Sequence, residues 1–141
     1  MKTLFRSLVG LGLWIAIASS VGAVLNPNII VNLEEPTTGR PYASVSNLRG
    51  WAVAPSGIAR IEIFVDGEYV LDVPYGGLRE DVGAAFPDYP NSDYSGFSMA
   101  YNSKSLSPGM HRMLARAYDT LGNYNDSESV FSADRFISPF I

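Results

Sequence analysis

The chain has no cysteine and only one histidine among its 141 residues. Without cysteine there is no disulfide bond, no thiolate metal ligand, no cysteine nucleophile and no lipid-modified cysteine of a bacterial lipoprotein. A single histidine also excludes zinc sites built from several histidines. The chain must therefore be stabilised by its apolar core, and a single domain of this length can bury about two-thirds of its unfolded surface.

Charged residues are also few, at 17 % of the chain, whereas 47 % of the residues are apolar, a composition typical of globular proteins. The net charge is −4, and removing a leader that carries Lys2 and Arg6 changes it to −6. An acidic surface repels phosphate groups. We therefore expect no nucleic-acid partner and poor binding to anionic membrane surfaces.

Residues 1–23 have the organisation of a signal peptide. Lys2 and Arg6 form a basic start, an apolar stretch runs from Leu8 to Ala18, and Val21-Gly-Ala23 offers the small or compact residues that a signal peptidase reads. We expect cleavage after this tripeptide, which leaves residues 24–141 as one domain, secreted or periplasmic and free of the membrane. The alternative is an uncleaved signal anchor, which needs about 20 apolar residues, whereas two serines and a glycine interrupt this run.

After the leader, apolar and polar residues alternate in short runs, which is the period of β-strands. Ile61, Ile63 and Val65 share one face of the strongest run, and Asp66-Gly67 follows as a hairpin signal, because both central positions of a type I′ turn need positive φ. The apolar tail, Phe136–Ile141, is expected to pair along a sheet edge. Seven runs with short turns predict an all-β sandwich of about seven antiparallel strands. They cover residues 29–33, 43–53, 58–65, 68–73, 96–101, 111–118 and 127–132.

One expected strand has an irregular pattern. Leu48, Gly50 and Ala52 share a face, but Val45 is out of phase with them. A bulge or bend near Ser46-Asn47 would bring all four side chains to the same face, since a bulge inserts one extra residue into a strand. We therefore predict a bulge there.

Residues 74–95 interrupt the alternation. A connection of about 20 residues without clear periodicity is uncommon in a compact domain and is usually functional or disordered. The segment contains four aromatic residues, which argue against disorder: Tyr75, Phe86, Tyr89 and Tyr94. One helical turn is expected near residues 78–85.

Two interpretations of this loop stay open. In the first, the loop folds back over a sheet face, where Phe86 and Tyr89 cover Trp51 and Phe64. Burial of such rings contributes on the order of 1.5–3 kcal/mol each. Arg79 then pairs with Asp81 or Asp93 and holds the loop.

In the second interpretation, the loop is a platform for a sugar or a protein. Aromatic rings stack well and carry a polar group when they are tyrosines, and they are enriched at binding surfaces. The candidate ligand-binding residues are Tyr75, Arg79, Tyr89 and Tyr94.

The order of the motifs resembles that of bacterial immunoglobulin-like domains. The resemblance rests on Leu33-Glu-x-Pro36, Gly50-Trp-Ala52, Gly57-Ile58, Ile61-x-Ile-x-Val-Asp-Gly67, Leu106-x-x-Gly109-x-His111 and Ala117-x-Asp119-x-x-Gly122-Asn123, and covers residues 28–134. It implies an immunoglobulin-like sandwich of the kind found as adhesion, spacer and enzyme-accessory modules in exported and surface proteins. The disulfide and buried tryptophan of antibody domains are not matched, and Trp51 lies on the face opposite Leu48 and Ala52.

Catalytic groups have weak support in the sequence. His111 lies on the apolar face of its strand with Met113 and Ala115, which favours a packed, hydrogen-bonded histidine, and no Gly-x-Ser-x-Gly nucleophile elbow accompanies it. Three carboxylate pairs could support a small hydrolase, but we expect them to be solvated, and adjacent residues of a strand face opposite sides. They are Glu34/Glu35, Glu80/Asp81 and Asp88/Asp93.

Calcium binding is a further alternative. Asp119, Asn123 and Asp126 cluster around one turn, and oxygen ligands from a loop are what calcium needs. A second group, Asp88, Asn91 and Asp93, clusters around another turn. Neither matches a defined calcium-loop spacing, and Asp and Asn also form turns by bonding the backbone. We expect turn formation and no metal.

The sequence thus predicts an exported, non-enzymatic binding or structural module without a cofactor, at the cell envelope or outside the cell. Its partner would be a protein or a glycan at the cell surface. A carbohydrate-binding accessory protein that uses the 74–95 loop is the first alternative, and a small hydrolase is the second.

Overall fold

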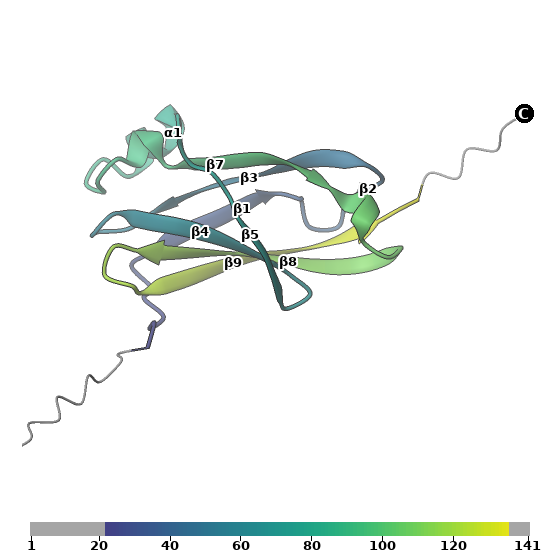
Figure 1. Cartoon of the computed structure of the whole chain (residues 1–141). Helices are drawn as coiled ribbons and strands as arrows, with labels where there is room; N and C mark the ends of the chain where they lie inside the picture. The colour runs from purple at the N-terminus through teal and green to yellow at the C-terminus, as the bar shows by residue number, and fades with distance from the viewer. Residues whose placement is uncertain (1–21, 136–141) are drawn as a thin grey trace, which may run out of the picture.

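The computed structural model describes residues 22–135. It is a sandwich of two β-sheets, drawn as an upper and a lower layer in Figure 1. The four-stranded sheet has the order β1 (Ile30–Glu35), β3 (Val45–Val53), β7 (Gly96–Asn102) and β6 (Tyr75–Gly77). The five-stranded sheet has the order β2 (Pro41–Tyr42), β9 (Tyr124–Ala133), β8 (Gly109–Asp119), β4 (Ile58–Val65) and β5 (Glu68–Asp72).

Three short helices complete the described chain: α1 (Glu80–Ala85) and two single 3₁₀ turns, η1 (Ser92–Tyr94) and η2 (Ser103–Ser105). No helix within residues 22–135 has the length and apolar character needed to cross a membrane. Nearly all of the predicted signal peptide and the tail predicted to pair along an edge lie outside the described residues.

The predicted two-sheet sandwich is confirmed, with two more strands than the sequence pattern shows. The additional strands, β2 and β6, contain two and three residues, which is too short for alternation to be visible. Within residues 22–135, the paired strands run antiparallel except β2 with β9, which is parallel.

Alternation correctly predicted the core-facing side chains of the central strands. Ile61 and Ile63 of β4 and Met113 and Ala115 of β8 are fully buried between the two sheets. Two phenylalanines, Phe97 of β7 and Phe131 of β9, supply the largest fully buried side chains. The Asp66-Gly67 hairpin is also confirmed, because φ is 51° at Asp66 and 86° at Gly67.

The bulge predicted near Ser46-Asn47 is wrong. β3 pairs with β7 in continuous register from Val45 to Trp51, and the Val45 side chain points outward with 62 % exposure. The pattern was broken by an exposed valine on a regular strand. The register shifts of this sheet lie on β1, between Leu33 and Glu35, and on β6, between Tyr75 and Gly77.

Gly50 makes room for the Phe97 ring at the centre of β3, within the four-stranded sheet. A Cβ atom at this position would lie 2.1 Å from the backbone oxygen of Asn32 and 2.5 Å from Cζ of Phe97. The Phe97 ring therefore occupies the space that a side chain would need. Burying a phenylalanine ring in this way contributes about 1.5–3 kcal/mol.

Candidate functional site

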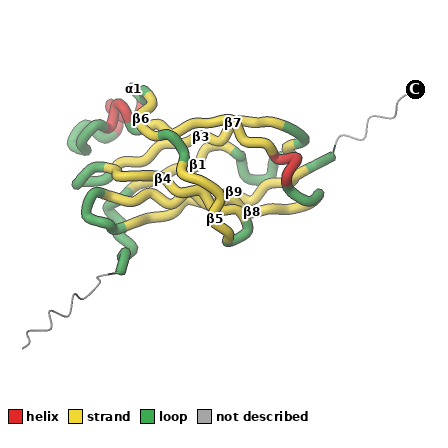
Figure 2. The backbone as a smooth tube through the Cα atoms, in the orientation of Figure 1, coloured by secondary structure: helices red, strands yellow, loops and turns green. Residues whose placement is uncertain are grey.

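The 74–95 segment is an ordered part of the sandwich. It forms β6, the helix α1 and the turn η1, and the helical parts lie at one end of the four-stranded sheet (Figures 1 and 2). The helical turn predicted near residues 78–85 is confirmed as α1. Backbone bonds join the segment to itself and to β3, including Arg79 N–H to Asp93 O at 2.7 Å and Ala52 N–H to Ser95 O at 3.0 Å.

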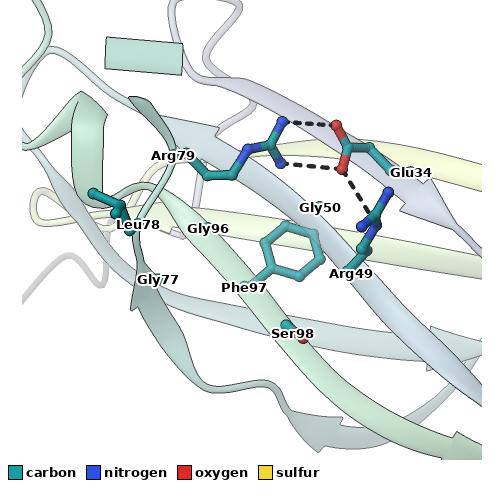
Figure 3. Close-up of a pocket in the computed structure, with 9 residues that line it drawn as sticks. All are labelled: Glu34, Arg49, Gly50, Gly77, Leu78, Arg79, Gly96, Phe97 and Ser98. Atoms are coloured by element: carbon teal, nitrogen blue, oxygen red, sulfur yellow. Dashed lines mark hydrogen bonds and ion pairs between the residues drawn. The ribbon is translucent and has the colours of Figure 1, made fainter. Parts of the chain in front are cut away.

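Arg79 fastens this segment to the far strand of the sheet. Its guanidinium donates to both carboxylate oxygens of Glu34 on β1, at 3.0 and 2.9 Å, as Figure 3 shows. It also donates to both oxygens of Asp81, at 2.8 and 2.7 Å. Such paired, charge-assisted bonds are among the strongest that side chains form. We call the Glu34–Arg79–Asp81 group the Arg79 clamp.

The predicted pairing of Arg79 with Asp81 is confirmed, and its contact with Asp93 runs through the backbone. The hydrogen bonds from Arg79 hold the pKa of the Asp81 carboxyl at about 2, and its bonds to both carboxylates raise the pKa of Arg79 itself. Asp81 and Arg79 are therefore both charged at neutral pH.

Glycines make room for the clamp. A Cβ atom on Gly96 of β7 would lie 3.1 Å from Cγ of Arg79 and 3.0 Å from the backbone oxygen of Gly77. The Arg79 side chain can therefore lie across β7 on its way to β1. A surface hollow opens beside it, lined by the clamp residues Glu34 and Arg79 together with Leu78 and Ser98 (Figure 3).

The Glu34/Glu35 pair differs from the prediction that its members face opposite sides and are solvated. The register shift between Leu33 and Glu35 on β1 brings both carboxylates to Arg49, with its Nε atom 3.8 Å from Glu34 and 3.5 Å from Glu35. Arg49 is half exposed, so these contacts are weak. Glu34 is engaged mainly by Arg79.

Aromatic rings of the loop cover one side of the sheet. Phe86 packs on Trp51 of β3 with ring centres 5.4 Å apart, and Tyr89 packs edge-on against Phe86 at 5.8 Å. The predicted cover over Trp51 is confirmed. The predicted cover over Phe64 is wrong, because Phe64 lies on β4 in the other sheet and contacts Tyr69 at 5.9 Å.

The four candidate ligand-binding residues occupy different environments. Tyr75 donates its hydroxyl to the Ala52 backbone oxygen at 2.9 Å, and burial raises the pKa of this tyrosine to about 12. Tyr89 donates to the Asn28 backbone oxygen at 3.4 Å, and Arg79 forms the clamp. Tyr94 is 53 % exposed.

Tyr94 has an apolar neighbour that the sequence analysis did not single out. Leu78 is 60 % exposed, and the chain neighbours of these two residues, Arg79 and Asp93, are joined by a backbone hydrogen bond. Leu78 and Tyr94 therefore flank the same junction. The sequence signal that could have indicated the pair is a leucine directly before Arg79 in a loop otherwise rich in glycine and acidic residues.

His111 is buried, as predicted, with 8 % exposure. Its ring nitrogens lie 2.6 Å from Asp66 Oδ2 and 2.6 Å from the Ser107 backbone oxygen. Both nitrogens are engaged within the protein.

The carboxylates considered for calcium make other contacts. Asp119 is buried and accepts hydrogen bonds from the Leu121 and Asn123 backbone amides at 3.0 and 2.8 Å, which is the predicted turn formation. Asp126 pairs with Arg116 through two bonds of 2.8 Å. Within residues 22–135, three or more acidic or histidine side chains do not gather as a metal site would require.

The outer face of the five-stranded sheet carries arginines stacked on tyrosines, which the sequence analysis missed. The guanidinium of Arg60 lies 3.7 Å from the centre of the Tyr118 ring, and that of Arg116 lies 4.1 Å from the centre of the Tyr124 ring. The alternation that placed Arg60 and Arg116 on outward faces was visible. Two strand registers bring the stacked residues together: β4 with β8, which pairs Arg60 with Tyr118, and β8 with β9, which pairs Tyr118 with Tyr124.

No protein-family model matches the chain, and no curated protein sequence matches it. Among solved structures, the endo-β-1,4-mannanase from Thermotoga petrophila is similar at a TM-score of 0.58 and 9 % identity, covering 76 % of this chain and 20 % of that one. Fibronectin(III)-like modules of Clostridium thermocellum CbhA are similar at a TM-score of 0.53 and 13 % identity. The match covers 81 % of this chain and 51 % of the CbhA chain. CopC from Methylosinus trichosporium OB3b has a TM-score of 0.44 and 14 % identity, and the match covers 79 % of this chain and 100 % of CopC.

The chain thus spans about a fifth of the length of the mannanase and about half of the length of the CbhA chain. At these identities the likeness concerns the fold. It agrees with the two-layer topology and shows an all-β sandwich similar to fibronectin(III)-like modules.

Proposed function

We propose that this chain is an exported, non-enzymatic sandwich module of the bacterial immunoglobulin-like kind that serves in binding or structure, secreted or in the periplasm. The Arg79 clamp is the observation that carries the proposal. It fastens a long loop to the sheet and so presents Leu78 and Tyr94 to solvent from a fixed support. A contact surface ordered before binding loses less entropy when the partner arrives.

Three of the groups considered for acid–base catalysis, His111, Glu34 and Asp81, support a non-enzymatic role. A general base needs a free lone pair within reach of the substrate proton. Both nitrogens of His111 are engaged inside the protein, and Glu34 and Asp81 are bound by Arg79. These groups stabilise the fold.

The partner would be a protein or a glycan at the cell surface, met by the exposed Leu78 and Tyr94 side chains. Tyrosine is enriched at the centres of interfaces because it combines a large apolar ring with a polar group. The hydroxyl bond of Tyr75 to Ala52 supports a packing role for that residue, and the exposure of Tyr94 supports a contact role.

Carbohydrate binding is the second candidate. Leu78, Ser98 and Arg49 line the same hollow, and the exposed Tyr94 follows Asp93, whose backbone oxygen is bonded to the Arg79 amide. A sugar could stack on the ring while its hydroxyls bond these polar groups. A sandwich similar to this one makes up a fifth of the length of an endo-β-1,4-mannanase.

Separate replacement of Tyr75, Tyr89 and Tyr94 by alanine distinguishes packing from contact. Tyr94→Ala should keep the melting temperature of the wild type and weaken partner binding by about tenfold or more, as expected of a contact residue. Tyr75→Ala should lower the melting temperature, because it removes a packed ring and the bond to Ala52. Differential scanning fluorimetry measures the stability of each variant.

Binding is measured on a glycan array and by affinity electrophoresis in soluble polysaccharides, with β-1,4-mannan among them. The same polysaccharides are assayed for newly released reducing ends. Binding without release supports the carbohydrate candidate. Catalytic turnover that is lost in Glu34→Gln would contradict the non-enzymatic proposal.

A further inference from the structure

His111 connects two separate turns at one end of the five-stranded sheet. It lies near the start of β8, with one ring nitrogen 2.6 Å from Oδ2 of Asp66 in the β4–β5 turn. The other nitrogen lies 2.6 Å from the backbone oxygen of Ser107, which precedes β8. The ring also packs near Phe131 of β9, with ring centres 6.2 Å apart.

The two partners define the protonation state of the ring. A backbone carbonyl oxygen only accepts hydrogen bonds, so the nitrogen facing Ser107 must carry a proton. Asp66 also accepts a bond from the Arg112 backbone N–H at 2.9 Å, and its side chain is 50 % exposed. An ionised carboxylate only accepts as well, so the second ring nitrogen must also carry a proton. The arrangement therefore requires the imidazolium form.

We propose that His111 is a pH-dependent latch: in its doubly protonated form it ties the Asp66-Gly67 turn to the Ser107 turn, and loss of one proton releases this end of the sheet. Neutral imidazole has one donor, so it can keep only one of the two bonds. Asp66, Gly67 and Arg112 also line a hollow on the outer face of the sheet. Release of the latch would therefore alter one side of that hollow.

The charged surroundings of His111 support this assignment. The β4–β5 turn contributes the Asp66 carboxylate, whose pKa is lowered by the Arg112 N–H bond and by His111. On β8, the Arg112 side chain faces the outer surface near Glu128 of β9 at 3.7 Å. Tyr101 of β7 stays neutral because burial raises its pKa. Lys104 of η2 is exposed to solvent.

The hydrogen bond to Asp66, followed by that to Ser107, raises the pKa of His111 above its ordinary value of 6.5, against the opposing effect of burial. The folded state thus holds the proton more tightly than the unfolded chain does. The stabilisation from the latch is complete below pH 6.5 and is lost as the pH rises through the pKa of the folded state.

Nuclear magnetic resonance can follow this titration directly, because the chain has one histidine. We expect the wild-type imidazole to titrate with a midpoint above 6.5, and Asp66→Asn to titrate at a lower midpoint. Asparagine tolerates the left-handed backbone at this position. The exchange protection of the Arg112 amide should fall about tenfold across the wild-type transition, the effect of one charge-assisted hydrogen bond.

Glu128→Gln is the matched control, because it removes a carboxylate near Arg112 on the opposite face of β8 and should leave the midpoint unchanged. A wild-type midpoint at or below 6.5, or constant protection of the Arg112 amide across the transition, would overturn the proposal. So would equal midpoints in the wild type and Asp66→Asn. If Asp66→Asn does not fold, the titration midpoint of His111 and the exchange protection of the Arg112 amide in the wild type decide whether the proposal holds.

Discussion

Replacing Gly50 by alanine is expected to destabilise the sandwich by about 3 kcal/mol or more, at the upper end of what overpacking costs. The new methyl group would lie 2.1 Å from the Asn32 backbone oxygen. This oxygen belongs to β1, which pairs with β3 at this point, so it cannot move away as the end of a side chain could. The Phe97 ring would be displaced as well. Urea unfolding followed by tryptophan fluorescence measures the loss.

Gly77→Ala is the matched control. The nearest atom to a Cβ there is the Gly96 backbone oxygen at 3.4 Å, an ordinary van der Waals contact, and we expect a change within about 0.5 kcal/mol. Equal stabilities of the two variants would show that the β1–β3–β7 contact is looser than described.

Arg79→Met is expected to lower stability by about 2 kcal/mol and to expose the 74–95 loop to proteases. Methionine keeps much of the apolar stem but leaves Glu34, only 24 % exposed, without its main partner. Breaking a fully buried ion pair costs about 3–5 kcal/mol, and the partial exposure of Glu34 and the 67 % exposure of Asp81 reduce this value. Chemical unfolding and limited proteolysis provide the two readouts.

Arg49→Met provides the comparison, because Arg49 also faces Glu34 but is 53 % exposed at a distance of 3.8 Å. Such a pair contributes about 0–1 kcal/mol, so its loss should leave the loop resistant to proteases. If the two methionine variants behave alike, Arg79 does not hold the loop.

Local pattern was sufficient for the strands and for one turn. Ile61 and Ile63 alternate with polar residues and face the core because side chains of a strand point to opposite sides. Asp66-Gly67 needed only its own backbone preference to form the hairpin. Helix α1 and the pairing of Arg79 with Asp81 could also be predicted from the sequence, because the residues that form them are close together in the chain.

The remaining features depend on register between distant strands. Glu34 is 45 residues from Arg79 in sequence, and only the pairing order of β1, β3 and β7 brings them together. Alternation gives the face of Phe64 but not the sheet to which it belongs, so its predicted cover was wrong. Val45 shows the converse error, because an apolar side chain need not be buried.

The central claim is that residues 74–95 form a fixed part of the sandwich surface, and backbone ¹⁵N relaxation of the wild-type protein tests it most directly. We expect order parameters of about 0.85 for the amides of α1 and η1, equal to those of β3 and β8. Values below about 0.6 across residues 80–94, with rigid strands on both sides, would contradict the claim.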